Sequence, residues 1–474
     1  MRRSNLTKLI LAGFILIFFN LIYTDYSYTN YYNQNKINLL QDKETYKTPK
    51  MGAYSPLHIQ GSSGWIDAKA RGLCTGSGTE SDPYIIANKT FVSNYSVNYA
   101  LKIENSHYDY FKIYNITCIN STSDSASSLR HSGLNLANTN LGTVDSVHCF
   151  NNSIGVYVTG SMSYDNFNII KNSNCSNNLE NGIRVVDWAY NTTVKNNIIN
   201  NNGNYGCYLS RAVNNTVKNN RIKDNVNNGL YMYLDVNNVT ADNNTIMNNG
   251  KYGLHLWSVE NVKVKNNIIK ENGWDGVYMY SNVNNVTVDN NIIKENERYG
   301  VFISDVSNST IRKNNIEKNQ EGIRAQNQVV NNKIISNKII NNTAEGFSTY
   351  YSGDNTRDFL FYNNTIAYNT DGIKIDGDTG DPQASNFTIC YNNISFNSDD
   401  GIDLEKSNNT IMYNNITHNN NRGIYFSSIS DNNIVFQNRF IENTVNARSD
   451  GSPNWFNTST AGNYWADYPG VDAD

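Results

Sequence analysis

The chain has 474 residues, a formal net charge of −4 and only 17% charged residues. It is therefore long enough to bury a sizeable core, and it has no basic excess that would suit a nucleic acid. Asn supplies 87 positions and Tyr 33, against 6 Pro. Because Asn disfavours helices and Ile and Val recur between the Asn residues, this composition argues against both a helical and a disordered protein.

The N-terminal segment has the layout of a signal peptide. Arg2, Arg3 and Lys8 precede an apolar run from Leu9 to Tyr23. The run is shorter than the ~20 residues that span a bilayer, and no clear small-x-small cleavage site follows it. We therefore expect an exported protein, extracellular or at the cell surface. Residues 1–23 would act as a signal peptide or an anchor and make the only membrane contact.

Two further segments precede the main body of the chain. Residues 24–55 are rich in Tyr, Asn and Lys, and we expect a poorly ordered linker there. Residues 56–99 are expected to form a leading segment and N-terminal cap. Within them "GSGTESDPYIIANKTF" indicates a turn that leads into a first strand, with Pro83 limiting the start of that strand.

A glycine phrase recurs from Ser132 onward, as in "NGLYM", "YGLHL" and "DGVYM". After each glycine apolar and polar residues alternate, as in Leu230 and Met232 against Tyr231 and Tyr233, which is the period of a strand with one buried face. The mean spacing is near 24 residues, and a period of ~20 to 50 residues indicates a solenoid, a propeller or an array. The glycines are Gly133, Gly155, Gly182, Gly206, Gly229, Gly253, Gly276, Gly300, Gly322, Gly346, Gly372, Gly401 and Gly423.

A second phrase of the form Asn-x-Thr/Lys-Val/Ile-x-x-Asn-x-Ile follows about ten residues later. Each repeat therefore holds at least two short strands joined by Asn-rich turns. A propeller blade would need ~40 or more residues, and the leucine-rich frame is absent. We predict an all-β protein, a parallel β-helix of about fourteen rungs over residues 100–445 with a C-terminal cap over 446–474.

One Asn position of the second phrase recurs in eleven rungs. In a parallel stack each copy lies about 4.8 Å from the next, so the amides can hydrogen-bond in a ladder along the axis. An inward-facing Asn is then satisfied. The members are Asn197, Asn220, Asn244, Asn267, Asn291, Asn314, Asn337, Asn364, Asn392, Asn414 and Asn438.

The cysteines occupy inward positions. In the first rungs Cys118, Cys149 and Cys175 take the place of the apolar residue, such as Ile222, that later rungs carry two positions beyond the Asn. Six cysteines in an exported chain allow three disulfides, but inward positions favour buried thiols. A bridge between two of the first three remains the alternative, because stacked neighbours lie within disulfide range.

Two outward positions follow each glycine and climb the stack as columns. Flat aromatic rings in a row suit the apolar faces of sugar rings, whereas stacked aromatics can also merely support one another in a sheet. Both columns become acidic toward the C-terminal end. The candidate substrate-binding residues are Tyr231, His255, Tyr278 and Phe302 in the first column and Tyr233, Trp257 and Tyr280 in the second.

Acidic residues cluster on two successive rungs. "NTDGIKID" supplies Asp371, and "NSDDGIDLE" supplies Asp399, Asp400 and Asp403. Acids this close need a bound cation, a retained proton or screening by solvent. The pattern therefore fits a calcium site, a carboxylate pair that acts as general acid and base on a glycosidic bond, or a run of solvated acids on a turn.

The rungs and the closing "AGNYWADYPGVDAD" resemble the NosD-type right-handed β-helix proteins, described as carbohydrate-binding and sugar-hydrolysis domains, over roughly residues 76–474. The resemblance implies a right-handed coil. The "NTDG" and "NSDDGID" pair is similar to family-nine pectate lyases, which bind a catalytic calcium ion through aspartates on two rungs. Carried over, the resemblance implies the calcium ligands Asp371, Asp399, Asp400 and Asp403.

The sequence departs from that lyase family at the catalytic lysine. The family places it on the following rung, where "RGIYFS" has Tyr425. Lys374, Lys406 and Arg422 are the nearby catalytic candidates, and nothing in the spacing singles one out. The sequence therefore favours calcium binding over lyase activity. The later Gly-His-Gly and Arg-Ile-Lys motifs of polygalacturonases are absent, which argues against hydrolysis.

These features together predict an exported, monomeric β-helix protein that binds a polysaccharide or cell-envelope glycan, with cleavage left open. A non-catalytic surface structural or adhesion protein is the alternative. Copper handling, which the NosD name suggests, is less favoured because the 6 His are scattered and no Met-rich stretch exists.

Overall fold

The structure is a computed structural model, in which the predicted signal peptide or anchor (1–23) and most of the predicted linker (24–55) lie outside the described residues. No helix in the described part of the chain is long and apolar enough to cross a membrane. The residues described are 52–93, 97–122, 131–161, 167–349, 356–377 and 385–466.

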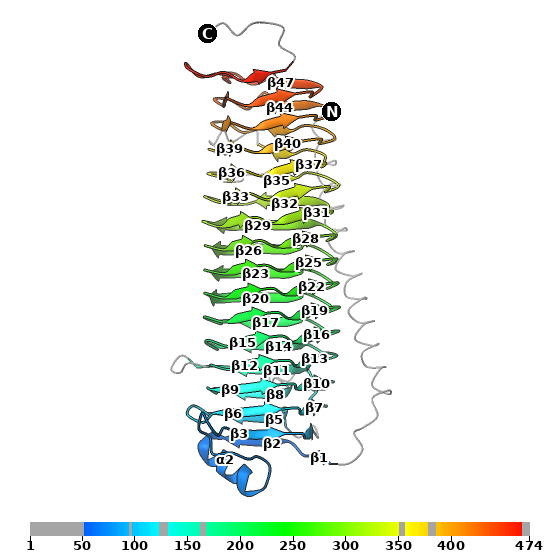
Figure 1. The fold of residues 1–474 in the computed structure, drawn as a ribbon, viewed down its shortest axis with the longest axis vertical. Helices are drawn as coiled ribbons and strands as arrows, with labels where there is room; N and C mark the ends of the chain where they lie inside the picture. The colour runs from blue at the N-terminus through cyan, green and yellow to red at the C-terminus, as the bar shows by residue number, and fades with distance from the viewer. Residues whose placement is uncertain are drawn as a thin grey trace, which may run out of the picture. The chain divides into compact units, whose positions relative to one another are not determined.

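The chain winds into a coil in which each turn contributes one strand to each of three sheets (Figure 1). Strands three apart in chain order therefore pair side by side, and the paired strands run parallel, as β20 (Leu230–Asn237), β23 (Leu254–Glu260) and β26 (Val277–Asn284) do. The described residues make about fifteen turns. This confirms the predicted right-handed parallel β-helix, with about one turn more than the repeats indicated.

Sheet B is built mainly from the glycine phrases. Its side chains alternate between the core and the outside, as the apolar–polar period predicted. Its other strands are β2 (Leu57–Gln60), β5 (Tyr99–Glu104), β8 (Ser132–Ala137), β11 (Ile154–Thr159), β14 (Asn181–Val186), β17 (Cys207–Ser210), β29 (Tyr299–Ser307), β32 (Glu321–Gln326), β35 (Phe347–Thr349), β38 (Ile373–Ile375), β41 (Ile402–Leu404), β44 (Arg422–Phe426) and β47 (Val445–Ser449).

Sheet C takes the first half of the second phrase. Its short strands bury only their central residue in most rungs. They are β3 (Tyr84–Ala87), β6 (Phe111–Tyr114), β9 (Gly142–Asp145), β12 (Ile169–Lys171), β15 (Thr193–Lys195), β18 (Thr216–Lys218), β21 (Thr240–Asp242), β24 (Lys263–Lys265), β27 (Thr287–Asp289), β30 (Thr310–Arg312), β33 (Lys333–Ile335), β36 (Leu360–Tyr362), β39 (Thr388–Cys390), β42 (Thr410–Met412) and β45 (Ile434–Phe436).

Sheet A takes the second half of the same phrase. Its strands are β1 (Ala53–Tyr54), β4 (Thr90–Val92), β7 (Thr117–Ile119), β10 (His148–Phe150), β13 (Asn174–Cys175), β16 (Ile198–Asn200), β19 (Arg221–Lys223), β22 (Thr245–Met247), β25 (Ile268–Lys270), β28 (Ile292–Lys294), β31 (Asn315–Glu317), β34 (Lys338–Ile340), β37 (Thr365–Ala367), β40 (Asn393–Ser395), β43 (Asn415–Thr417), β46 (Arg439–Ile441) and β48 (Tyr464–Trp465).

The predicted Asn ladder exists and lies buried at the turn between sheets C and A. Asn244 donates from Nδ2 to Oδ1 of Asn267, and Asn267 donates to Asn291, both at 3.0 Å. A second buried ladder, which the sequence reasoning did not identify, follows sheet A, where Asn225 donates to Asn249 at 2.9 Å. Residues just before these amides have positive φ, a conformation that Asn tolerates well. The two ladders explain much of the Asn content.

The described cysteines are all buried free thiols, as the inward positions predicted. Cys149 lies in register with Cys118 on one side and with Cys175 on the other. Burial raises the pKa of the Cys149 thiol well above its ordinary value. These thiols therefore pack as small apolar groups in the first rungs.

The N-terminal end of the coil is closed by a helix that was not predicted. Helix α2 (Gly61–Ala70) lies at the blue end of Figure 1. Its Trp65 is fully buried, stacks on Tyr84 with 5.0 Å between ring centroids, and donates a hydrogen bond to Ser106 at 2.9 Å. Within the predicted leading segment (56–99) helix α2 therefore covers the apolar end of the core, whereas β2, β3 and β4 already form a first turn of the coil, before the predicted start at residue 100.

At the C-terminal end an aromatic ring of the predicted cap covers the core. Trp465 stacks on buried Phe440 with 4.5 Å between ring centroids, whereas Trp455 and Tyr464 are exposed. Strand β47 extends the last turn of sheet B to Ser449, so the coil runs a few residues past the predicted boundary.

Candidate functional site

The outer face of sheet B carries the candidate residues in register. Tyr231 pairs with His255, His255 with Tyr278, and Tyr278 with Phe302 across adjacent strands. None of these side chains belongs to the interior core cluster. The stacking of glycine phrases that the sequence predicted is therefore correct.

Rings of the first outward column pack mainly on one another. Tyr231 lies on His255 with 4.3 Å between ring centroids, and Tyr278 lies on Phe302 at 4.7 Å, both face to face. Tyr231, His255 and Phe302 are buried, and Tyr278 is partly exposed. Burial lowers the pKa of His255 to about 3 and raises that of Tyr278 to about 12, so both are neutral at pH 7.

The second outward column is more accessible. Tyr233, Trp257 and Tyr280 are each partly exposed. The Trp257 ring is turned 66° from Tyr233 and 71° from Tyr280, with centroids 5.9 and 5.0 Å apart. These three residues therefore form the accessible edge of an aromatic layer that the first column supports.

A third column, which the sequence reasoning missed, stands just before each glycine. Tyr252 stacks on Tyr278 with 4.1 Å between centroids, and Tyr299 stacks on Phe302 at 5.6 Å. The signal was visible in the phrases "YGCYL", "NGLYM", "YGLHL", "DGVYM" and "YGVFI", in which Tyr alternates with Asn or Asp before the glycine. These tyrosines complete the aromatic layer.

The intervening Asn and Asp residues have a backbone role. Oδ1 of Asn228 accepts the N–H of Tyr252 at 3.4 Å, and Oδ1 of Asp275 accepts the N–H of Tyr299 at 3.1 Å. A backbone N–H without an acceptor beside the core would destabilise the fold. At every second turn the side-chain oxygen of an Asn or Asp on the preceding rung therefore accepts the N–H of the tyrosine.

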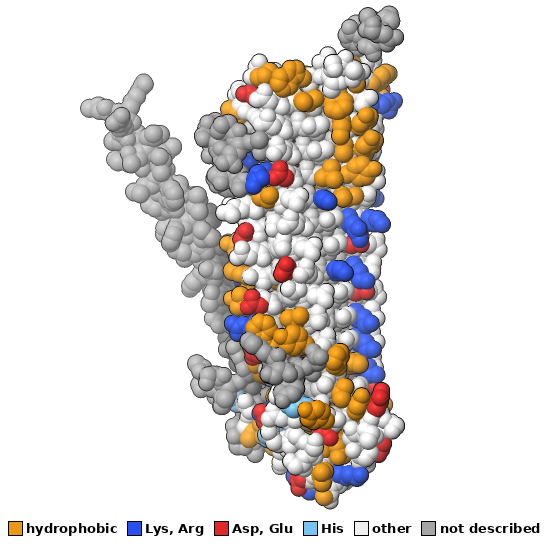
Figure 2. Space-filling model, turned by 90° about the vertical axis from the view of Figure 1, so that its left-hand side faces the viewer, with side chains coloured by type: hydrophobic (Ala, Val, Ile, Leu, Met, Phe, Trp, Pro, Cys, Tyr) orange, Lys and Arg blue, Asp and Glu red, His pale blue; other side chains and the backbone are white. Residues whose placement is uncertain are grey.

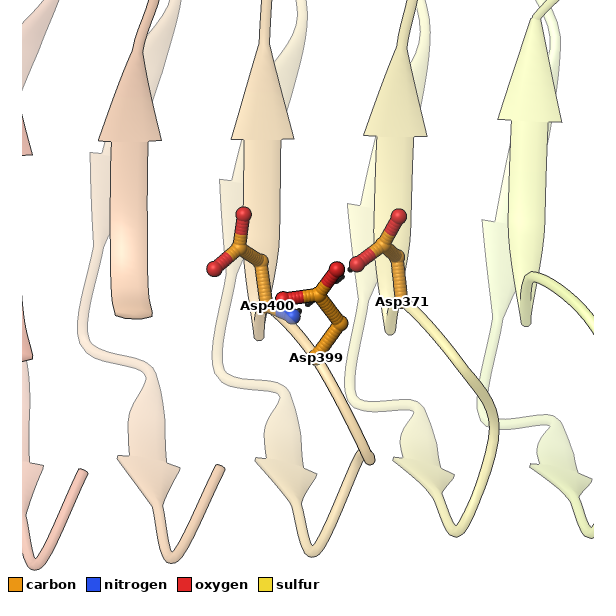
Figure 3. Close-up of side chains that lie close together, drawn as sticks. All are labelled: Asp371, Asp399 and Asp400. Carbon is orange, nitrogen blue, oxygen red and sulfur yellow. Dashed lines mark hydrogen bonds between the residues drawn. The ribbon is translucent and has the colours of Figure 1, made fainter. Parts of the chain in front are cut away.

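Three of the four predicted acids come together near the C-terminal end. One carboxylate oxygen from each of Asp371, Asp399 and Asp400 lies within 4.8 Å of the others. Figure 3 shows Asp371 and Asp400 at the starts of neighbouring strands, with the carboxylate of Asp399 between them. In the described part of the chain no other group of His, Cys, Asp and Glu meets this condition.

Two of these acids repeat the backbone role of the third column. Oδ1 of Asp371 accepts the N–H of Asp400 at 2.9 Å, and Oδ1 of Asp400 accepts the N–H of Arg422 at 2.8 Å. Arg422 also holds Asp400 through its side chain, with Nε 2.9 Å from Oδ1 and Nη2 2.5 Å from Oδ2. Asp400 is therefore already paired with Arg422. Asp399 accepts a hydrogen bond on its Oδ1 from Asn421.

Asp403 lies on the next outward position and not among the three. It is in register with Lys374 on one side and with Tyr425 on the other. Burial, with the charges of Asp371 and Asp400, raises the pKa of Asp403 to about 7. Burial also raises the pKa of Asp371 to about 6.

The three catalytic candidates differ in placement. Burial opposes the charge on Lys374, but Asp376, Asp371 and Asp403 outweigh it and raise the pKa of the lysine. The Asp400 carboxylate likewise raises the pKa of Arg422 against the effect of burial. Lys406 lies beyond the end of β41, in the turn toward sheet C.

Comparison with known proteins finds two family matches. The family described as "Right handed beta helix region" matches residues 67–258 and 211–366, more than half of the chain. The family described as "Periplasmic copper-binding protein (NosD)" matches residues 381–470. No curated protein sequence matches the chain.

Solved structures with a similar coil share little sequence with this chain. The Dettilon tailspike protein gp208 is 13% identical with a TM-score of 0.49, covering 66% of this chain and 64% of that one. The A-module of mannuronan C-5 epimerase AlgE4 from Azotobacter vinelandii is 14% identical with a TM-score of 0.41, covering 75% and 90%. A mutant of the periplasmic alginate epimerase AlgG is 13% identical with a TM-score of 0.42, covering 85% and 84%.

Proposed function

The chain belongs to the right-handed β-helix family, and on that scaffold we propose that it is an exported protein that binds a polysaccharide or cell-envelope glycan along sheet B. The observation that carries this proposal is the partly exposed column of Tyr233, Trp257 and Tyr280, which rests on a packed layer of rings. The fold alone does not assign an activity, because parallel β-helices host many functions.

The geometry of this column suits an extended chain of sugars. Successive outward residues are one strand spacing apart, about 4.8 Å, and their ring centroids lie 5.9 and 5.0 Å apart. Tyr and Trp offer an apolar face and a polar edge, which suits sugar rings with apolar faces and hydroxyl rims. Because the rings behind the column are locked by stacking, little side-chain entropy is lost on binding. The family description of residues 381–470 names a periplasmic protein, which supports export.

Removal of two of these rings tests the proposal. We expect Trp257→Ala with Tyr280→Ala to weaken glycan binding about tenfold or more, because buried aromatic contacts dominate such interfaces. Affinity electrophoresis on gels that contain neutral and acidic polysaccharides measures the change, and circular dichroism checks the fold. Tyr108→Ala is the control, since Tyr108 is exposed and lies away from this column.

Two outcomes would contradict the proposal. One is a wild-type chain that no polysaccharide retards. The other is a double variant that each gel retards as strongly as the wild type. Either result favours the second candidate, a structural or adhesive surface protein that works without a glycan-binding face.

At the acidic end we propose calcium binding by Asp371, Asp399, Asp400 and Asp403. Calcium takes six to eight oxygen ligands, often from several carboxylates. Because Arg422 already holds Asp400, calcium has to compete for that ligand, and we expect a dissociation constant of ~10⁻⁴ to 10⁻³ M, the range of weak extracellular sites.

Cleavage is not part of the proposal. A general base must be deprotonated at the working pH, which for lysine requires a lowered pKa, and the pKa of both Lys374 and Arg422 is raised. The aromatic Tyr425 occupies the position in register with Asp403 where the lyase resemblance placed a lysine. Copper handling is likewise not part of the proposal, because the 6 His are scattered along the sequence.

The acids predict a dependence of stability on pH. Because the folded-state pKa values of Asp371 and Asp403 are raised to about 6 and 7, the folded chain binds more protons than the unfolded chain between pH ~4 and ~7. Stability in EDTA therefore falls as pH rises through this window, by about 1 to 2 kcal/mol after allowance for solvent screening. Thermal unfolding from pH 4 to 8 measures the fall, and Asp403→Asn reduces it.

Calcium should restore stability where the acids are charged. At pH 8 we expect added calcium to raise the unfolding midpoint of the wild type, but not that of Asp371→Asn with Asp403→Asn. Asn at position 371 keeps an oxygen for the backbone N–H, as Asn228 does. Asp67→Asn, at an exposed position of helix α2, is the control. If calcium does not change the unfolding midpoint of the wild type, the calcium proposal is wrong. The predicted dependence of stability on pH does not rest on calcium and is unaffected.

A further inference from the structure

The outer face of sheet C changes character abruptly along the stack. In the rungs from β12 to β30 the third residue of each strand is charged, among them Lys218, Asp242 and Arg312. From β33 onward the residues in the same register are Ile335, Tyr362, Cys390, Met412 and Phe436. Figure 2 shows this change as hydrophobic side chains above a column of mostly basic ones.

Neighbouring positions extend this apolar surface. Trp455 forms an isolated bridge with Ile434, the first residue of β45. Tyr362, Tyr391, Tyr413 and Phe436 form a continuous row with ring centroids 5.5, 4.9 and 6.2 Å apart. We call this surface the sheet C patch, and its members are Ile335, Leu360, Tyr362, Tyr391, Met412, Tyr413, Ile434, Phe436 and Trp455.

Two tyrosines of the patch hold an unfavourable backbone conformation. Tyr391 and Tyr413 have φ of 58° and 56°, at a turn position where Asn196, Asn219 and Asn243 stand in earlier rungs. A bulky side chain at positive φ is a rare and strained choice, costing of order 1 kcal/mol or more. Asn would fit at lower cost, as it does in those earlier rungs.

The chemistry of the patch does not suit a glycan. The Tyr391 and Tyr413 rings lie face to face at an interplanar angle of 11°, so they cover each other's faces. The outward positions of β36, β39, β42 and β45 hold no charged residue, and their polar groups are the hydroxyls of Tyr362, Thr388 and Thr410. A sugar site needs several convergent polar groups.

The size and charge of the patch fit a second copy of the chain. Its five most exposed members are 36 to 50% exposed, and with the half-buried ones they offer roughly 400 to 600 Å² of apolar surface. That is at the upper end for a monomer, and with a polar rim it approaches the ~800 Å² that each partner buries in a standard interface. Because the patch is uncharged, two copies can meet there without repulsion.

We propose that the sheet C patch is a self-association surface, where two copies of the chain pack sheet on sheet about a two-fold axis. Such an isologous contact needs only one self-complementary surface, and two-fold dimers are the commonest oligomers. Flat sheet faces pack about 10 Å apart with interleaved side chains. The proposal replaces the expected monomer, and it is independent of glycan binding because sheet B is a different face.

The state of association of the full chain tests this proposal. We expect sedimentation equilibrium at about 1 to 100 µM to show a dimer for the wild type, and Tyr391→Asn with Tyr413→Asn to raise its dissociation constant at least tenfold. The variant should fold well, since Asn is the residue that earlier rungs use at this turn. Met412→Lys, which places a charge within the patch, should act in the same direction.

Tyr368→Asn is the matched control. Tyr368 is also an exposed tyrosine at positive φ, 59°, but it stands at the other end of the sheet A strand and stacks on Phe396. It should leave the dimer unchanged, and the double variant should bind glycans as the wild type does. A wild type that is monomeric throughout the range, or a double variant that associates as strongly, would overturn the proposal.

Discussion

Gly276→Ala is expected to lower the free energy of unfolding by about 3 kcal/mol or more, at the upper end for overpacked sites. A Cβ at this position would lie 2.5 Å from Cγ2 of Ile293, 2.7 Å from the carbonyl oxygen of Gly300 and 2.8 Å from Nδ2 of Asn296. These atoms belong to the backbone, the core and the buried amide ladder, so none can move freely. Urea unfolding monitored by circular dichroism measures the loss.

Gly462→Ala is the control for this substitution. A Cβ at Gly462 would meet no atom within 4 Å, and we expect a change within about 0.5 kcal/mol. The comparison separates the effect of crowding from the general effect of adding a methyl group. Equal stability of the two variants would mean that the rungs can move apart and that the glycine phrases do not fix the stacking.

Asn267→Ala is expected to cost about 3 to 5 kcal/mol, because several buried groups lose a partner at once. Asn244 loses the acceptor of both its backbone N–H, at 2.8 Å, and its Nδ2, at 3.0 Å. The carbonyl of Ala241 loses a donor at 3.0 Å. The same unfolding measurement applies.

The matched control is Asn393→Ala, on an exposed amide pair. Oδ1 of Asn393 accepts a hydrogen bond from Asn415 at 2.9 Å, and water can replace that contact. We expect a loss below about 1 kcal/mol. If Asn267→Ala and Asn393→Ala lower the free energy of unfolding equally, burial does not explain the contribution of the ladder to stability.

The fold could be predicted because the repeat fixes the neighbours of each residue. Once the glycine phrases are stacked, Asn267 must meet Asn291 and Tyr278 must meet Phe302, and both contacts exist. Helix α2 was not predicted, because it occurs once and no repeat marks it. The second Asn ladder was not predicted, because it lies at the turn after sheet A, beyond the recurring Asn phrase.

The site was harder to predict. The sequence shows which side chains lie on the outer face of a sheet, but not which neighbouring side chains cover them. Tyr231 and His255 point outward yet are buried by neighbouring rings, and the column before the glycine supplies part of that cover. Asp400 was expected to be available to a cation, but it pairs with Arg422. The two residues are 22 positions apart in the chain and meet only because their strands are in register, which a count of charges does not reveal. Which rings are accessible therefore had to come from the structure.

The buried amide ladder has a direction. Each Asn donates toward the C-terminal neighbour, so the dipoles of the side chains align and can polarise one another. Asn463, after the repeats, accepts the last donor from Asn438 at 3.0 Å and passes its own N–H groups to carbonyls at Val435 and Phe456. The tail thus terminates a polar chain as well as covering an apolar end. Because each turn contacts mainly the turns next to it, a coil of this kind can lengthen or shorten by complete repeats while its terminators stay the same.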